Sequence, residues 1–155
     1  MSDDYLGHRR FFDLVDLARL PPQGTLEGAS GFKSDPGPYE TSLIKRGETA
    51  WRTPFADMTC EQVRLMVEQK MGLQWLGRPA LAFALRYPEA EITNYPGEMA
   101  LLCLEAVDDL AEHAQPEFSD WVRGDFGWME DLFSWSRSEL RRAKEALERA
   151  REIAT

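Results

Sequence analysis

The chain has 155 residues, 43% of them apolar and 11% aromatic, which suits one globular domain over residues 1–155 and excludes a disordered chain. Its most apolar stretch, residues 73–85, includes Arg78 and Pro79 and is shorter than the ~20 residues of a membrane-spanning helix. Because no secretory signal is visible, we expect a cytoplasmic protein, and the net charge of −9 argues against binding to nucleic acid or anionic membranes.

The N-terminal third of the chain shows weak helical patterning. Phe11 and Val15 belong to an apolar set that predicts a short helix over residues 8–20, which a pair of prolines ends. Glycine and proline punctuate residues 21–40, and this composition predicts a long irregular segment. Residues 41–58 are expected to hold a short strand or a helical turn around residues 42–44.

The helical pattern becomes strong at Thr59. Thr59 and Gln62 match a capping box, in which each residue satisfies a backbone N–H at the start of a helix, and Gly72 is a natural stop. Residues 73–87 are apolar on nearly every side, which is typical of a helix inside the core. Pro79 is expected to kink this helix or to begin its second half.

Two further helices complete the predicted fold. A Tyr-Pro-Gly-Glu run predicts a helix start near Glu98, and apolar spacing continues to Leu110. The last helix is predicted from about Trp128 to Ile153, where apolar and paired charged residues recur at helical spacing. We therefore expect a mainly α protein, a compact bundle of about five to six helices with a long irregular N-terminal segment.

Residue types that carry catalysis are sparse. Cys60 and Cys103 are predicted to be buried, reduced thiols rather than a disulfide. The two histidines stand far apart, so we expect no metal site and no cofactor. Asp108, Asp109 and Glu112 are a weak candidate for Mg²⁺ or acid–base chemistry, but a solvated helix face explains them better. We expect a binding protein, not an enzyme.

The acidic surplus is concentrated in residues 89–125, which contain ten carboxylates and one arginine. Such a region attracts a basic partner and repels nucleic acid, although a merely solvated face is the alternative. Two aromatic residues beside turns in this region, Tyr95 and Trp121, are candidate apolar anchors, with core packing as their alternative. The predicted charged contacts are Glu89, Glu91, Glu98, Asp108, Asp109 and Glu112.

Three segments resemble the helical immunity proteins of contact-dependent growth inhibition systems. Residues 41–46 (TSLIKR) resemble the family's T-S-L-V-R-R run, and residues 59–65 (TCEQVRL) resemble its T-x-E-Q-hydrophobic-R-L helix start. Residues 95–101 (YPGEMAL) resemble its Y-P-G-D-L-L stretch, with Glu98 in place of the usual aspartate. Further residues match in register between these segments, so the similarity runs from about Thr41 to Leu102, which is about two-fifths of the chain, and it keeps its spacing across several helix caps. The residues that match between the segments are Gln69, Gly72, Leu73, Leu76, Pro79, Ala80, Leu81, Leu85 and Pro88.

The resemblance implies a family-like core over about 41–110, with residues 1–24 and 111–155 as additions. It also implies a function, because such proteins bind and block the toxin domain of a delivered effector in the cytoplasm. Many of these toxins are basic nucleases, which agrees with the acidic region described above. Most of the shared motif is assigned to folding through caps, stops and helix starts: Thr59, Glu61, Gln62, Arg64, Gly72, Pro79 and Gly97.

A different kind of binding protein is the main alternative. An adaptor or regulatory subunit could use the Trp-rich C-terminal half, which contains Trp121, Trp128 and Trp135. The sequence leaves open which toxin is bound, whether its active site is covered, and the oligomeric state.

Overall fold

In the computed structural model, residues 6–15, 23–33 and 41–154 are described, and their regular structure is helical. The mainly α fold expected from the sequence is confirmed, with ten α-helices of 4 to 18 residues in these ranges where about five to six helices were expected. Their bounds are α1 Phe11–Leu14, α2 Leu26–Ser30, α3 Ser42–Arg52, α4 Cys60–Glu68, α5 Leu73–Arg86, α6 Glu98–Glu105, α7 Val107–His113, α8 Glu117–Val122, α9 Gly127–Leu132 and α10 Arg137–Ala154, with a 3-10 turn η1 over Phe55–Asp57.

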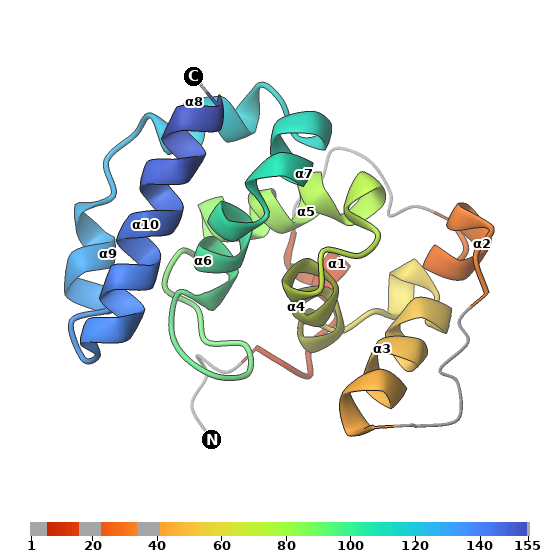
Figure 1. Cartoon of the computed structure of the whole chain (residues 1–155). Helices are drawn as coiled ribbons and strands as arrows, with labels where there is room; N and C mark the ends of the chain where they lie inside the picture. Colours follow the sequence, from red (N-terminus) through yellow and green to blue (C-terminus); the bar gives the residue numbers. More distant parts are fainter. Residues whose placement is uncertain (1–5, 16–22, 34–40, 155) are drawn as a thin grey trace.

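The central element is α5, which packs against α4, α6 and α7. The C-terminal α10 lies across α6, α7 and α8, and Figure 1 shows it with α9 at one end of the molecule. At the other end, α2 packs on α3, and α3 packs on α4 (Figure 1). The buried apolar side chains form one cluster that runs from Leu6 to Ala150. No helix in the described ranges combines the length and hydropathy that a membrane span requires.

The predicted capping box at Thr59 is present and starts α4. Thr59 Oγ1 accepts a hydrogen bond from the Gln62 N–H at 3.2 Å, and Gln62 Oε1 accepts one from the Thr59 N–H at 3.0 Å. The expected stop at Gly72 is wrong, because α4 already ends at Glu68. Gly72 instead begins α5 in the left-handed conformation (φ +69), where a Cβ would meet Leu26 Cδ2 at 2.6 Å. Gly72 therefore sets the turn between two helices.

The N-terminal third is more helical than its sequence suggests. Thr41 Oγ1 accepts from the Ile44 N–H at 3.1 Å and caps α3, an 11-residue helix where only a strand or one turn was expected. Thr25 Oγ1 caps α2 at 3.0 Å from the Gly28 N–H, so part of the predicted irregular segment is helical. The predicted helix over 8–20 is represented by α1 alone; residues 16–22 and 34–40 lie outside the described ranges.

The C-terminal half contains breaks that the periodicity did not predict. The expected helix up to Leu110 divides at Ala106, whose ψ of 32 separates α6 from α7. The expected helix over 128–153 divides between α9 and α10, where Ser136 Oγ accepts from the Glu139 N–H at 3.3 Å. By contrast, α5 continues through Pro79, which is buried.

Candidate partner-binding surface

The predicted acidic contacts do not share one face. The prediction of Glu98 as a surface contact is wrong, because this residue begins α6 and its side chain is completely buried. Glu89 and Glu91 lie in the loop before α6, and Figure 1 shows this loop at the opposite end of α6 from α7. Asp108, Asp109 and Glu112 all belong to α7. The expected carboxylate surface is therefore two separate groups, without Glu98.

Arginines neutralise much of the acidic region. Asp108 Oδ2 lies 3.1 Å from Arg149 Nη2 on α10, whereas Glu112 Oε2 lies 3.7 Å from His113 Nε2 and pairs with no lysine or arginine of the described residues. Glu105 makes a two-pronged pair with Arg142, and these hydrogen bonds raise the pKa of Arg142 above its usual range. Of the ten carboxylates in residues 89–125, five form ion pairs with arginines: Glu98, Glu105, Asp108, Glu117 and Asp120.

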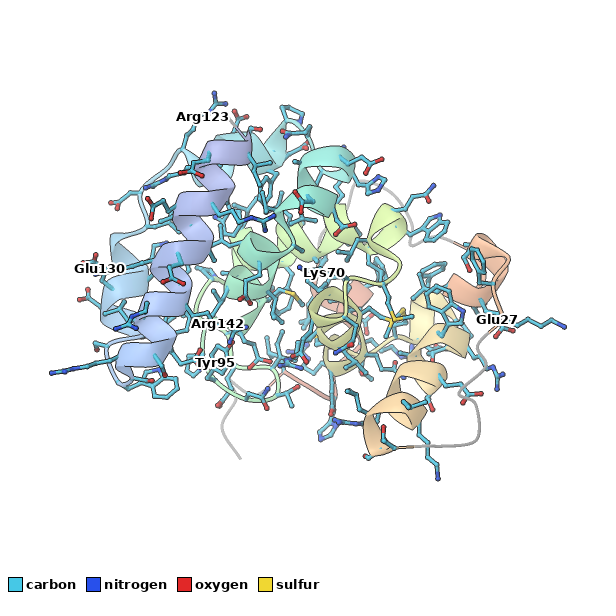
Figure 2. All side chains as sticks on the ribbon, viewed as in Figure 1. Glu27, Lys70, Tyr95, Arg123, Glu130 and Arg142 are labelled. Atoms are coloured by element: carbon cyan, nitrogen blue, oxygen red, sulfur yellow. The ribbon has the colours of Figure 1, made fainter. Side chains whose placement is uncertain are left out.

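Both candidate aromatic anchors are half-buried and packed within the fold. The Tyr95 ring lies 5.9 Å from that of Phe133, and its hydroxyl accepts a hydrogen bond from Arg142 Nη1 at 3.3 Å (Figure 2). Burial raises the pKa of Tyr95, and the Arg142 charge opposes that rise. The Trp121 ring lies 5.2 Å from that of Phe126. The Tyr95 contacts connect the loop before α6 to the end of α9 and to α10. The Trp121 contact connects α8 to the turn between α8 and α9.

The tryptophans of the alternative binding mode differ in exposure. Trp128 is half-buried, with its ring 5.9 Å from that of Phe126. Trp135 is 61% exposed and is the large aromatic side chain of this half that solvent reaches most. The Trp-rich half therefore offers one exposed ring, at the junction between α9 and α10.

A buried ion pair joins two of the three segments that carry the family resemblance. Arg64 on α4 is 8% exposed, and its Nε lies 2.5 Å from Glu98 Oε1 at the start of α6. The Glu98 carboxylate also accepts hydrogen bonds from the backbone N–H groups of Thr93, Asn94 and Tyr95, at 3.1, 2.8 and 2.7 Å. Glu98 thereby fixes the loop before α6, since a single carboxylate accepts hydrogen bonds from three backbone amides and forms an ion pair with Arg64.

The Arg64 segment also lines a cleft, together with residues of the third resembling segment, 41–46. The cleft has a volume of about 320 Å³ and lies between α3, α4 and the loop before α6. Seven of its nine lining residues belong to the resembling segments 41–46 and 59–65, and Thr93 closes one side. The seven are Lys45, Arg46, Thr59, Glu61, Gln62, Arg64 and Leu65. Arg64 therefore connects all three resembling segments, because it lines the cleft with residues of 41–46 and pairs with Glu98 of 95–101.

A second, apolar groove opens on the other side of Leu65. It has a volume of about 380 Å³ and runs between α3, α4 and the segment that follows α2. The sequence pattern did not indicate this groove, because residues 41–58 were expected to hold a short strand or a helical turn instead of the helix α3. The signal was present in Thr41, a good helix cap placed directly before Leu43 and Ile44.

No three His, Cys, Asp or Glu side chains within 6–15, 23–33 and 41–154 gather as a metal site requires. Cys60 and Cys103 are buried free thiols, as predicted, and burial raises the pKa of Cys60 to about 12. Comparison of the chain with protein-family models, curated proteins and solved structures finds no match.

Proposed function

We propose that this protein is an immunity protein, which binds the C-terminal toxin domain of a cognate contact-dependent growth inhibition effector and blocks it in a one-to-one complex. The observation that carries the proposal is the meeting of all three resembling segments around the Arg64–Glu98 ion pair and its cleft. A chance likeness of short sequences has no reason to bring those segments together in space.

The retained residues also have identifiable structural roles. Thr59 and Gln62 form the cap of α4, and Arg64 pairs with Glu98. Gly97 has φ +82, and a Cβ there would lie 2.5 Å from Leu132 Cδ2, so this position needs glycine. These roles support a shared scaffold, and the contacts that select one toxin then belong to the surface around it.

The charge of the chain supports a basic toxin domain as the partner. The net charge of −9 gives a long-range attraction, even though five carboxylates of the acidic region are paired with arginines. Within the described ranges, Glu89, Glu91, Asp109 and Glu112 form no ion pair with a lysine or arginine, and they stay candidates for contact with such a partner. In this proposal the attraction speeds association, and apolar contacts set the lifetime of the complex.

The proposal predicts that a large effector ending in a toxin domain is encoded immediately upstream of this chain's gene, and the test uses the C-terminal domain of that effector. That domain is expressed in cells from an inducible promoter, with or without the full-length chain, and growth is followed. We expect the domain alone to stop growth and the chain to restore it. As a specificity control, toxin domains from unrelated effectors should remain toxic in the presence of the chain.

Two results would contradict the proposal. One is unchanged toxicity of the cognate domain when the chain is present in excess. The other is equal protection against every unrelated toxin domain, which would indicate a general stress effect instead of specific binding.

A further inference from the structure

The apolar groove between α3 and α4 gathers most of the large apolar side chains that solvent reaches. Seven such side chains are exposed within the described ranges, and four of them line this one groove. Their exposed fractions are 74% for Phe32, 41% for Leu43, 37% for Ile44 and 43% for Met71. Exposed apolar side chains gathered in one place mark an interaction site, whereas single ones are ordinary.

The groove is built on a fixed base. Trp51, Leu65 and Met66 line it and are themselves buried. The indole Nε1 of Trp51 donates a hydrogen bond to the Phe32 carbonyl at 2.8 Å, which ties the segment after α2 to α3. A preformed groove costs a partner less ordering entropy than one that must be assembled on binding.

Two lysines lie at the groove, although the chain as a whole is acidic. Lys33 lines it, and Lys70 stands in the sequence between the lining residues Gln69 and Met71; both lysines are exposed. The one carboxylate in the lining, Glu48, lies 2.7 Å from Arg52 Nη1 and is neutralised by it. Within the described ranges, neither Lys33 nor Lys70 forms an ion pair. Figure 2 shows Lys70 at the edge of the α4–α5 turn.

We propose that this groove is the docking site for an apolar segment of the toxin domain, and that carboxylates flank that segment. The inference rests on the proposed function and adds the surface and the chemistry of the contact. Apolar side chains enter between Ile44 and Met71, and the flanking carboxylates meet Lys33 and Lys70. A toxin domain with a net positive charge still presents carboxylates to Lys33 and Lys70 when its acidic residues are concentrated at this segment.

The apolar part is tested with charge introduced at exposed positions. Ile44→Glu and Met71→Glu are compared with Leu85→Glu and Ile153→Glu, which place the same charge on exposed apolar residues of α5 and α10. Affinity of each full-length variant for the upstream-encoded toxin domain is measured by calorimetry, after circular dichroism has confirmed folding. We expect each groove variant to lose at least about 30-fold in affinity, the scale of an interface hot spot, and the controls to stay within about threefold.

The charged part is tested by reversal. Lys33→Glu/Lys70→Glu is compared with Arg137→Glu/Arg141→Glu, which changes the net charge equally on exposed residues of α10. We expect the groove pair to weaken binding at least about tenfold more than the control pair, with the difference shrinking at high salt. Equal effects of the two pairs, or tighter binding by the groove pair, would overturn the acidic flank.

The outcomes separate the two proposals. If the wild-type chain does not bind the toxin domain, the proposed function fails and this inference fails with it. If the wild type binds but the groove variants behave like Leu85→Glu, only the docking site is wrong. If the wild type is a dimer that Ile44→Glu converts to a monomer, a second copy of the chain occupies the groove and the toxin-docking role is overturned.

Discussion

Replacing Glu98 with glutamine is expected to destabilise the fold by about 3 kcal/mol, the lower part of the range for breaking a buried ion pair. Glutamine keeps the shape of the side chain but loses the charge that compensates Arg64, whose Nε lies 2.5 Å away. Glutamine also has one acceptor oxygen instead of two for the hydrogen bonds that three backbone N–H groups donate to the Glu98 carboxylate. We expect the lower part of the range for this loss of stability because Glu68 still compensates Arg64, with its Oε2 2.6 Å from Arg64 Nη2.

Urea unfolding followed by tryptophan fluorescence measures this free energy. For a domain of this size, about 3 kcal/mol corresponds to a fall of about 6–12 °C in Tm. Glu89→Gln is the matched control, because it makes the same chemical change on an exposed carboxylate, and its unfolding curve should overlay that of the wild type. Adding Arg64→Met to Glu98→Gln should recover part of the loss, since it removes the uncompensated charge. A Glu98→Gln protein within about 1 kcal/mol of wild type would refute the reasoning.

Three further predictions follow from particular residues. Gly97→Ala should destabilise the fold by about 2–3 kcal/mol, and Gly31→Ala by about 1 kcal/mol. Both glycines have a positive φ, so both substitutions strain the backbone. Only at Gly97 does the added Cβ also meet another side chain, since it would lie 2.5 Å from Leu132 Cδ2, whereas nothing lies within 4 Å of a Cβ at Gly31. Equal losses in urea unfolding would count against the close packing at Gly97. Burial raises the pKa of Cys60 to about 12 and raises the pKa of Cys103 also. Neither thiol should therefore react with Ellman's reagent at pH 8 until urea unfolds the chain. Fast labelling of the native protein would contradict this prediction. The association rate constant for the toxin domain should fall at least about tenfold as salt rises from low to physiological concentration, because salt screens the attraction by the net charge of −9. A rate constant that stopped-flow measurement finds unchanged would contradict charge steering.

The elements that the sequence predicted well are those with local signals. The α4 cap depends on Thr59 and Gln62, which are three residues apart, and α5 is apolar on nearly every side. The length of α3 could not be predicted in this way, because it has only Ala50 and Trp51 buried. Its other large apolar residues, Leu43 and Ile44, face a groove open to solvent, so they do not follow the spacing of a core stripe.

The candidate site shows the same limit more clearly. The sequence placed Glu98 at a helix start and counted it as a surface charge, because nothing local indicates that Arg64 from another helix lies beside it. Likewise, the arginines that neutralise Glu105 and Asp108 come from α10, far along the chain. Ion pairs of this kind depend on the packing of distant helices, which net charge and spacing do not report. The apolar groove was missed for the same reason, since its lining comes from three separate segments.

The account depends most on specific, stoichiometric inhibition by this chain. The direct measurement is a titration of the upstream-encoded toxin domain, at fixed concentration and with its activity as the readout, against increasing amounts of the full-length chain. We predict a linear loss of activity that reaches zero at one chain per toxin domain. Full toxin activity at a several-fold excess of the chain would contradict the central claim.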